Sequence, residues 1–211
     1  MPLICCMAAP KLIFDFGNVL IHVNESLTYQ AFEALGARPE LADNRSLFQA
    51  FDRGEINTEA FTSGIKAFLP QRCSHADVLR AWNAMLLEIP NSSYRLMRKL
   101  RQHFDCYLLS NTSVPHIAEI KRQAGPYQWA QFANNFQTLH YSYDLGVRKP
   151  DHAIFQKVME LENWKDESCI LIDDREENLN AAASFGWKAM HFALDKGHQH
   201  AILQKQLLSL L

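Results

Sequence analysis

The sequence lacks a long hydrophobic run, a basic run, an internal repeat and any low-complexity stretch. No apolar stretch in the 211 residues approaches the roughly 18 residues that a membrane span needs, so we expect no membrane partner. Lysine and arginine number 21 and aspartate and glutamate 23, which gives a formal net charge of -2. A nearly neutral chain without a basic arm argues against nucleic acid as the main partner. The hydrophobic fraction of 48% is typical of a globular protein with a full core.

Cysteine is scarce, and its spacing indicates no metal site. The five cysteines include the adjacent pair Cys5 and Cys6, but no Cys-x-x-Cys pair follows. This pattern favours reduced thiols in a cytoplasmic protein. The opening segment is apolar without a leading positive charge, so a signal peptide is the lesser alternative. Organised sequence begins only near Lys11, which makes Met7 an alternative start to Met1.

Residues 24–88 carry a helical pattern. Apolar residues recur there at helical spacing, with breaks near Gly36, at 53–55 and at Pro70. Ser74 with Asp77 three residues later is typical of a capping box at a helix start. We therefore predict a bundle of about four helices in this segment.

Strands and helices alternate in the rest of the chain. Short apolar runs at 12–16, 106–109 and 169–172 predict buried strands. Such an alternation predicts an α/β fold, in which helices cover both faces of a parallel sheet. Two further strands are expected at 136–141 and 188–192, and helices at 90–104, 116–123, 151–161, 175–185 and 200–211.

Polar residues stand at or just beyond the predicted strand ends, where parallel sheets bind their ligands. Taken singly each is weak evidence, because a strand-terminal Asp more often forms a cap or turn. Two adjacent carboxylates after four apolar residues repel each other, so a bound cation or another functional use competes evenly with a structural role. The residues are Asp15, Ser110, Asn111, Lys149, Asp173 and Asp174.

Together these residue types suit the cleavage of a phosphate ester. A carboxylate can attack phosphorus and form an aspartyl phosphate. Because carboxylate and phosphate repel each other, positive charge must offset both, and Mg²⁺ held by carboxylates together with one lysine would supply it. A hydroxyl and backbone N–H groups would hold the remaining phosphate oxygens.

Four short segments carry a more specific pattern. They read Phe-Asp-Phe-Gly-Asn-Val-Leu at 14–20, Leu-Leu-Ser-Asn-Thr at 108–112, Asp-Leu-Gly-Val-Arg-Lys-Pro at 144–150, and Ile-Leu-Ile-Asp-Asp-Arg-Glu-Glu-Asn at 170–178. In order, spacing and strand context they resemble the haloacid dehalogenase-like superfamily of phosphohydrolases. The resemblance spans almost the whole chain. It implies a three-layer Rossmann-like core formed by residues 1–23 and 89–211, with an inserted all-helical cap domain at residues 24–88.

The resemblance also implies roles for the residues around the phosphoryl group. Asp15 would be the nucleophile. Lys149 would be catalytic and would bind the phosphoryl group, and Ser110 and Asn111 would bind it as well.

The same resemblance implies Mg²⁺ as the cofactor. Asp15 and Asp174 would bind the ion directly, and Asp173 through water. Gly17 would contribute its backbone carbonyl.

Gly17 departs from the pattern of most phosphatases of the superfamily, which carry a second Asp there as general acid and base. The Asp-x-Gly-Asn-Val form, like Arg-Gly-Glu-Ile at 53–56, resembles a sub-branch that includes bacterial phosphatases of glucose 1-phosphate. Histidine is a common proton donor in enzymes, so His22 could supply the missing proton, although a structural role on its loop is favoured.

We therefore predict a Mg²⁺-dependent phosphatase of a small phosphorylated substrate, such as a sugar 1-phosphate, that acts through an aspartyl phosphate. The main alternative, favoured by Gly17, is a binding or regulatory protein of the same fold without turnover. A 2-haloacid dehalogenase fits less well, because the paired carboxylates have no role without a cation, and a mutase is disfavoured by the missing acid. Candidates for substrate contact from the cap are Arg53, His75 and Trp82.

Overall fold

The computed structural model describes residues 10–165, 168–194 and 199–211. The predictions about Cys5 and Cys6, about the start at Met1 or Met7, and about a signal peptide lie outside the described residues. Within the described ranges, no helix is long and apolar enough to cross a membrane. The cytoplasmic location stays a prediction.

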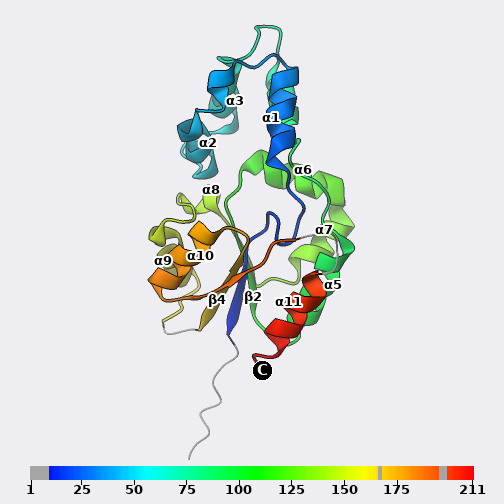
Figure 1. Ribbon diagram of the computed structural model, residues 1–211, viewed down its shortest axis with the longest axis vertical. Coiled ribbons are helices and arrows are strands. Elements are labelled where there is room, and N and C mark those ends of the chain that lie inside the picture. Colours follow the sequence, from blue (N-terminus) through cyan, green and yellow to red (C-terminus); the bar gives the residue numbers. More distant parts are fainter. Residues whose placement is uncertain (1–9, 166–167, 195–198) are drawn as a thin grey trace, which may run out of the picture.

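A five-stranded sheet forms the centre of the molecule (Figure 1). Its strands are β1 (Lys11–Phe14), β2 (Cys106–Ser110), β3 (Thr138–Tyr141), β4 (Cys169–Asp173) and β5 (Lys188–His191). The order is β3-β2-β1-β4-β5, and every neighbouring pair is parallel. The residues of β2 and β4 are buried throughout, as expected of apolar strands that are covered on both faces.

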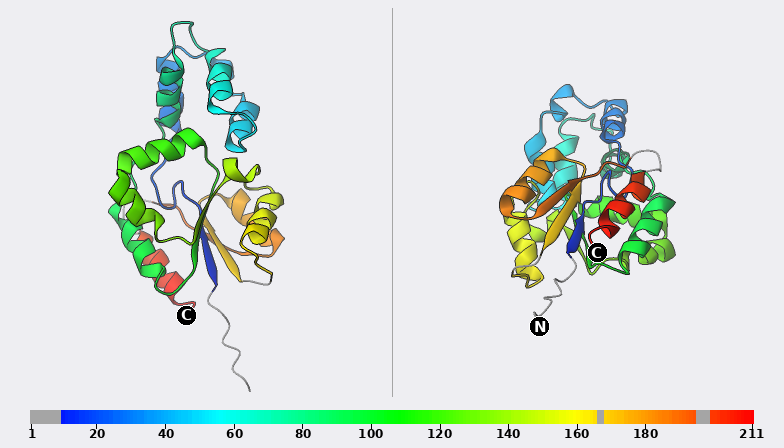
Figure 2. Two further views of the ribbon diagram at one scale, coloured as in Figure 1. Left: turned by 180° about the vertical axis from the view of Figure 1, so that it is seen from behind. Right: turned by 60° about the horizontal axis from the view of Figure 1, so that its bottom comes forward.

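Helices cover both faces of this sheet, so the predicted three-layer α/β core is confirmed. They are α5 (Asn91–Leu100), α6 (Val114–Ala124), α7 (Pro126–Ala133), α9 (His152–Leu161), α10 (Glu176–Phe185) and α11 (Gln199–Leu208). Buried residues of α5, α6, α7 and α11 share one hydrophobic cluster with one face of the sheet. Those of α9 and α10 share a second cluster with the other face. Figures 1 and 2 show the two groups on opposite sides of the strands.

Two helices of the core were not predicted. The sequence predicted one helix at 116–123 and none between it and the strand at 136–141, but α7 begins at once after α6. Gly125 adopts a φ of 77° at this corner, and Pro126 occupies the first helical turn, where its missing N–H is not needed. Phe132 of α7 is fully buried and stacks on Phe16 at 5.5 Å between ring centroids. The second is the single turn α8 (Ser142–Leu145).

The predicted bundle of helices lies beyond one end of the strands (Figure 1). It consists of α1 (Glu25–Ala34), a short 3₁₀ turn η1 (Pro39–Leu41), α2 (Arg45–Asp52), α3 (Thr58–Lys66) and α4 (His75–Asn83). The bundle has a hydrophobic cluster of its own, in which Phe51 and Phe61 stack at 3.9 Å. Ser74 and Asp77 form the expected capping box. The division of the chain into a core domain and a cap domain stays a prediction.

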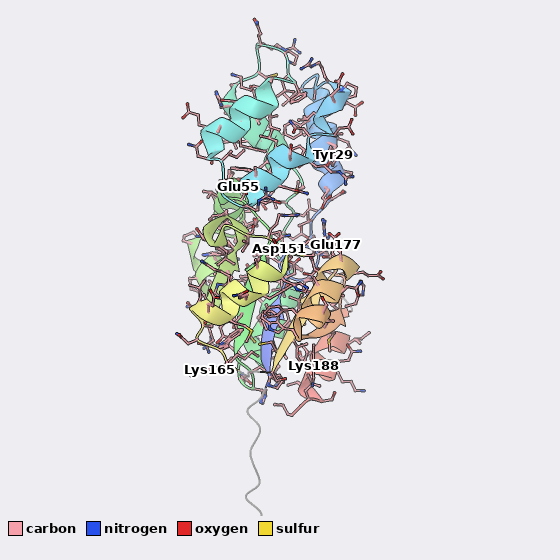
Figure 3. All side chains as sticks on the ribbon, turned by 90° about the vertical axis from the view of Figure 1, so that its left-hand side faces the viewer. Tyr29, Glu55, Asp151, Lys165, Glu177 and Lys188 are labelled. Atoms are coloured by element: carbon pink, nitrogen blue, oxygen red, sulfur yellow. The ribbon has the colours of Figure 1, made fainter. Side chains whose placement is uncertain are left out.

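The bundle faces the carboxyl ends of the strands. In Figure 3, Asp151 and Glu177 lie on the side of the core next to the bundle, whereas Lys165 and Lys188 lie at the far end. Trp82 of α4 connects the two parts: its Nε1 donates to Ser113 Oγ at 3.1 Å, and its ring stacks on His116 at 4.7 Å. The bundle and the carboxyl ends of the strands therefore enclose the region that contains the polar residues predicted to form the site.

A close backbone approach adds to this contact. Gly54, in the turn between α2 and α3, has a φ of +65°, and a Cβ placed there would lie 2.3 Å from the carbonyl oxygen of Tyr143 in α8. Only glycine allows both this backbone conformation and this proximity. The turn after α2 is thus seated directly on the core.

Candidate active site

Asp15 lies at the point of the sheet where the direction of strand order reverses. From β1 the chain runs outward through β2 and β3 on one side, while β4 and β5 lie on the other. The backbone N–H of Asp15 donates to the carbonyl of Ile172 at 2.9 Å, which fixes this residue between β1 and β4. Ligands of open α/β sheets bind at such a switch point.

Lys149 joins two of the predicted carboxylates. Its Nζ lies 2.7 Å from Asp15 Oδ1 and 2.6 Å from Asp173 Oδ2, and the residue is 1% exposed. Burial alone would lower the pKa of Lys149, but the two carboxylates outweigh it and hold the pKa above its ordinary value. Burial raises the pKa of Asp15 to about 6, against the lowering effect of Lys149. Lys149 is therefore a buried cation whose charge stabilises the ionised forms of both Asp15 and Asp173.

Asp15, Asp173 and Asp174 form a cluster that suits a divalent cation. Each offers an oxygen, and these oxygens lie within 4.8 Å of one another. Lys149 balances one of the three negative charges, so two remain in excess. Hard carboxylate oxygens with this charge excess fit Mg²⁺.

The two neighbouring aspartates differ in their surroundings. Asp173 is fully buried, and its oxygens accept from Lys149, the Arg175 N–H and the Asn178 amide. Burial would raise the pKa of Asp173, but these donors keep it below its ordinary value. Asp174 is only partly buried, and burial together with the charge of Asp173 raises its pKa. The freer oxygens of Asp174 are therefore better placed for a metal ion.

The end of β2 supplies the predicted phosphoryl-binding residues. Ser110 is 4% exposed, and its hydroxyl has no hydrogen-bond partner among the described residues. The side-chain amide of Asn111, in contrast, already has a partner: its Nδ2 donates to the backbone carbonyl of Lys149 at 2.8 Å. Gly17 faces the same space, and a Cβ there would meet Val23 Cγ2 at 3.5 Å, an ordinary contact. A side chain at this position is thus sterically possible.

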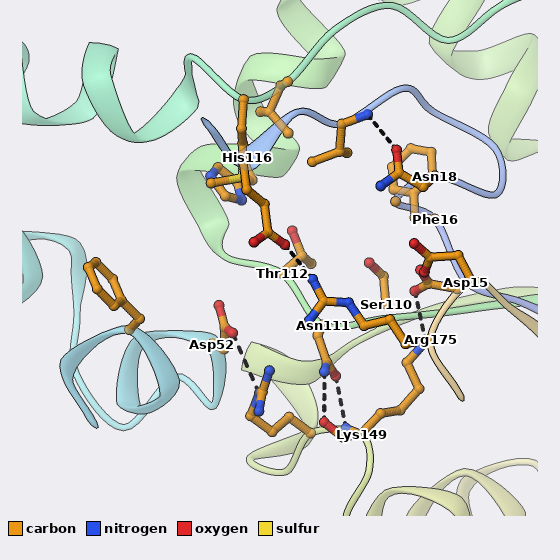
Figure 4. A pocket seen from close by; sticks show the side chains of 18 of the residues that line it. Asp15, Phe16, Asn18, Asp52, Ser110, Asn111, Thr112, His116, Lys149 and Arg175 are labelled. Carbon is orange, nitrogen blue, oxygen red and sulfur yellow. Dashed lines mark hydrogen bonds and ion pairs between the residues drawn. The ribbon is translucent and has the colours of Figure 1, made fainter. Parts of the chain in front are cut away.

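A cavity of about 660 Å³ opens between the sheet edge and the bundle (Figure 4). This volume lies within the range of roughly 300–1,000 Å³ that is usual for small-ligand sites. Asp173 is not part of the lining and lies behind Lys149. The structure thus brings every other predicted site residue to one cavity: Asp15, Gly17, Ser110, Asn111, Lys149 and Asp174.

Of the three candidates for substrate contact from the bundle, only Trp82 lines this cavity. Arg53 is paired with Glu55 at 2.6 Å, and His75 lies 2.5 Å from the Thr62 hydroxyl. His22 does not line the cavity either. Its backbone bonds to Leu87 and Glu88, which favours the structural reading of this residue.

Several lining residues were missed from the sequence. Three polar residues of α2 line the cavity at positions i, i+4 and i+7, which is the spacing of one helical face. That spacing is visible in the sequence, but a polar face of a surface helix usually contacts only solvent. Arg148 and Arg175 stand next to predicted site residues in sequence. The missed residues include Arg45, Gln49, Asp52, His116, Arg148 and Arg175.

The model of the haloacid dehalogenase-like hydrolase family matches residues 12–186, which is most of the chain. The chain therefore belongs to the haloacid dehalogenase-like hydrolase family. Two curated relatives are phosphatases. The D-ribitol-5-phosphate phosphatase of Bacteroides thetaiotaomicron is 23% identical over 190 residues, which cover 84% of this chain and 89% of the relative. A sesquiterpene phosphatase of Aspergillus oryzae is 25% identical over 190 residues, which cover 88% and 91%.

Solved structures agree with this assignment. The magnesium complex of a family enzyme from Bacteroides thetaiotaomicron matches with a TM-score of 0.84 and 27% identity, covering 92% of this chain and 98% of that one. A complex of that enzyme with magnesium and inorganic phosphate matches with a TM-score of 0.78 and 26% identity, covering 92% and 99%. An L-2-haloacid dehalogenase of Xanthobacter autotrophicus, at 16% identity and a TM-score of 0.61, shares the fold.

These comparisons confirm the predicted family, the Rossmann-like fold, an enzyme of the phosphatase class and Mg²⁺ as its cofactor. They do not identify the substrate. The roles of the individual site residues stay predictions.

Proposed function

We propose that this chain is a Mg²⁺-dependent phosphatase of small, hydroxylated phosphate monoesters, such as sugar or sugar-alcohol phosphates. The observation that carries the proposal is that Asp15, Lys149 and Asp174 line one cavity together with Ser110, whose hydroxyl has no hydrogen-bond partner among the described residues. This arrangement supports Asp15 as the nucleophile, Lys149 as a fixed cation and Asp174 as a metal-binding carboxylate.

The reaction proceeds in two halves. In the first, an Asp15 oxygen bonds to phosphorus while the bond from phosphorus to the leaving alcohol breaks, and that alcohol takes up one proton. In the second, water attacks the same phosphorus, inorganic phosphate leaves, and one proton is released. Lys149 and the Ser110 hydroxyl hold the phosphoryl oxygens beside Asp15. Asp15 and Asp174 would hold Mg²⁺, which would supply positive charge that offsets the phosphate and the carboxylates.

The substrate class rests on the relatives and on the cavity. A relative that acts on D-ribitol 5-phosphate favours a polyhydroxy leaving group, and a cavity with several charged lining residues suits one. Ribitol 5-phosphate is an ester of a primary alcohol, so this relative does not support the preference for a sugar 1-phosphate that we predicted. That preference stays a prediction.

A phosphate-release assay on the purified chain tests the proposal. The substrates are ribitol 5-phosphate, glucose 1-phosphate and p-nitrophenyl phosphate, each measured with Mg²⁺ and with excess chelator. We expect phosphate from all three with Mg²⁺ and none with chelator. Release that is unchanged in excess chelator, or no release from any ester with Mg²⁺, would contradict the proposal.

A further inference from the structure

One face of α2 points a set of polar side chains into the cavity. Arg45, Gln49 and Asp52 follow one another at intervals of four and three residues and all line the cavity. The opposite side of the helix packs into the bundle through Phe51, which is 3% exposed. The polar face therefore has a fixed orientation relative to the cavity.

Asp52 is the most buried of these three residues and has few partners. Its Oδ2 lies 3.5 Å from Arg148 Nε, and no described residue donates a hydrogen bond to it. Arg148 Nε is itself buried and without a hydrogen-bond partner among the described residues. A buried charged group without hydrogen bonds is costly. The Arg148 Nε–H donor and the Asp52 acceptor therefore lie side by side next to the cavity, and neither makes a hydrogen bond with a described residue.

The protonation state of Asp52 suits a hydroxyl partner. Burial raises the pKa of Asp52 to about 7, although Arg148, Arg175 and Arg53 oppose the shift. Near neutral pH both forms of the carboxyl group are therefore present. The ionised form accepts a hydrogen bond from a hydroxyl, and the protonated form can also donate one.

Asp52 lies away from the reacting atoms. Figure 4 places Asp52 and Asp15 on opposite sides of the pocket, with Asn111 and Arg175 between them. A phosphate ester attacked by Asp15 therefore extends its leaving group toward Asp52. Asp52 is placed to contact the far end of that group, not the oxygen that leaves phosphorus.

We propose that Asp52, paired with Arg148, binds a hydroxyl on the far end of the leaving group and selects polyhydroxy esters over apolar ones; this rests on the proposed phosphatase function. A hydroxyl satisfies this partly buried pair, since it can donate to Asp52 and accept from Arg148. An alkyl or terpene chain in the same place would remove water and leave both groups without a hydrogen bond. Sites built to bond a hydroxyl reject analogues that lack it for this reason.

Kinetics of Asp52→Asn and Asp52→Leu test the assignment, with three substrates. Ribitol 5-phosphate carries the hydroxyls, n-pentyl phosphate has the same chain length without them, and p-nitrophenyl phosphate has no hydroxyl on its leaving group that could donate to Asp52. Asp43→Asn is the matched control, because Asp43 is an exposed residue of the bundle outside the cavity lining.

We expect Asp52→Leu to lower kcat/KM for ribitol 5-phosphate by about 10–100-fold, the loss of one hydrogen bond to a charged group, mainly through KM. Asp52→Asn should lose less, because the amide still bonds a hydroxyl. The kcat/KM for p-nitrophenyl phosphate should fall much less than that for ribitol 5-phosphate in both variants, and the kcat/KM for n-pentyl phosphate should rise in Asp52→Leu. Asp43→Asn should leave all three substrates unaffected.

Two results would overturn the assignment. Unchanged kinetics on ribitol 5-phosphate would show that Asp52 does not bind the leaving group. An equal loss on all three substrates would show that it acts by seating the bundle on the core. If the wild-type chain released no phosphate from any ester, the proposed function would fail, but the role of Asp52 would still be decided by calorimetry. Ribitol 5-phosphate should then bind more weakly when Asp52→Leu is added to the Asp15→Asn chain.

Discussion

The side-chain amide of Asn111 holds the backbone of Lys149 at both ends. Its Nδ2 donates to the Lys149 carbonyl at 2.8 Å, and its Oδ1 accepts from the Lys149 N–H at 2.9 Å. The loop after β2 thereby fixes the start of a side chain whose Nζ reaches Asp15. Asn111 thus positions the lysine, whatever part it has in substrate binding.

The paired aspartates should separate into a metal ligand and a structural residue. Asp174→Ala should weaken Mg²⁺ binding in calorimetry more than Asp173→Ala does. The reason is that the Asp173 oxygens already accept hydrogen bonds from Lys149, Arg175 and Asn178. Asp173→Ala should instead lower the free energy of unfolding by about 1–3 kcal/mol, since it leaves the buried Asn178 amide without its acceptor. A larger loss of metal affinity at Asp173 would reverse this assignment.

An acidic side chain in place of Gly17 should raise kcat for phosphate esters whose leaving groups are poor. The site admits a side chain, because a Cβ would make only ordinary contacts with Val23 and Asp15. A placed general acid contributes roughly 10²–10⁴-fold, so Gly17→Asp should raise kcat for glucose 6-phosphate at least about tenfold. p-Nitrophenyl phosphate, whose leaving group needs no proton, should gain little. Gly17→Asn is the control of matched size. If both variants behave alike, proton donation at this position is not limiting.

The wild-type chain should prefer a sugar 1-phosphate to the matching 6-phosphate. With no acid side chain at Gly17, the more acidic anomeric hydroxyl leaves more easily than a primary one. Paired measurements of kcat/KM on glucose 1-phosphate and glucose 6-phosphate decide this. A clear preference for the 6-phosphate would mean that another group donates the proton. His22→Ala would then be the first variant to measure, although His22 does not line the cavity.

Asp52 should destabilise the fold as pH rises. Its pKa is about 7 in the folded chain and 3.8 by ordinary reference, so ionisation costs the folded state more than the unfolded one. This destabilisation is absent below pH 3.8, grows between pH 3.8 and about 7, and is complete above about pH 7. Asp52→Asn should therefore raise Tm relative to wild type more at about pH 8 than at about pH 4. A Tm difference that is the same at both would contradict the raised pKa.

The strand-end residues could be predicted from the sequence because their positions follow from topology. Once 12–16, 106–109 and 169–172 are taken as parallel strands, Asp15, Ser110 and Asp173 must meet at one edge of the sheet.

The substrate-facing residues of the bundle could not be predicted in this way. Their place depends on how the bundle sits on the core, which is set by contacts such as Trp82 with His116 and Gly54 with Tyr143. These contacts join residues far apart in the chain, and no local pattern signals them. Arg53 was expected in the cavity on sequence grounds, but the neighbouring Asp52 occupies it.

In the proposed reaction, Asp15 becomes phosphorylated during turnover. An acyl phosphate is reduced by borohydride to an alcohol, whereas a free carboxylate is not. Quenching the Mg²⁺-loaded chain with borohydride during turnover of p-nitrophenyl phosphate, followed by peptide mass spectrometry, should find the reduced residue at position 15 only. The Asp15→Asn chain should show neither reduction nor more than a small fraction of wild-type kcat. Turnover without any reduced residue at position 15, or an Asp15→Asn chain that keeps substantial activity, would contradict covalent catalysis by Asp15.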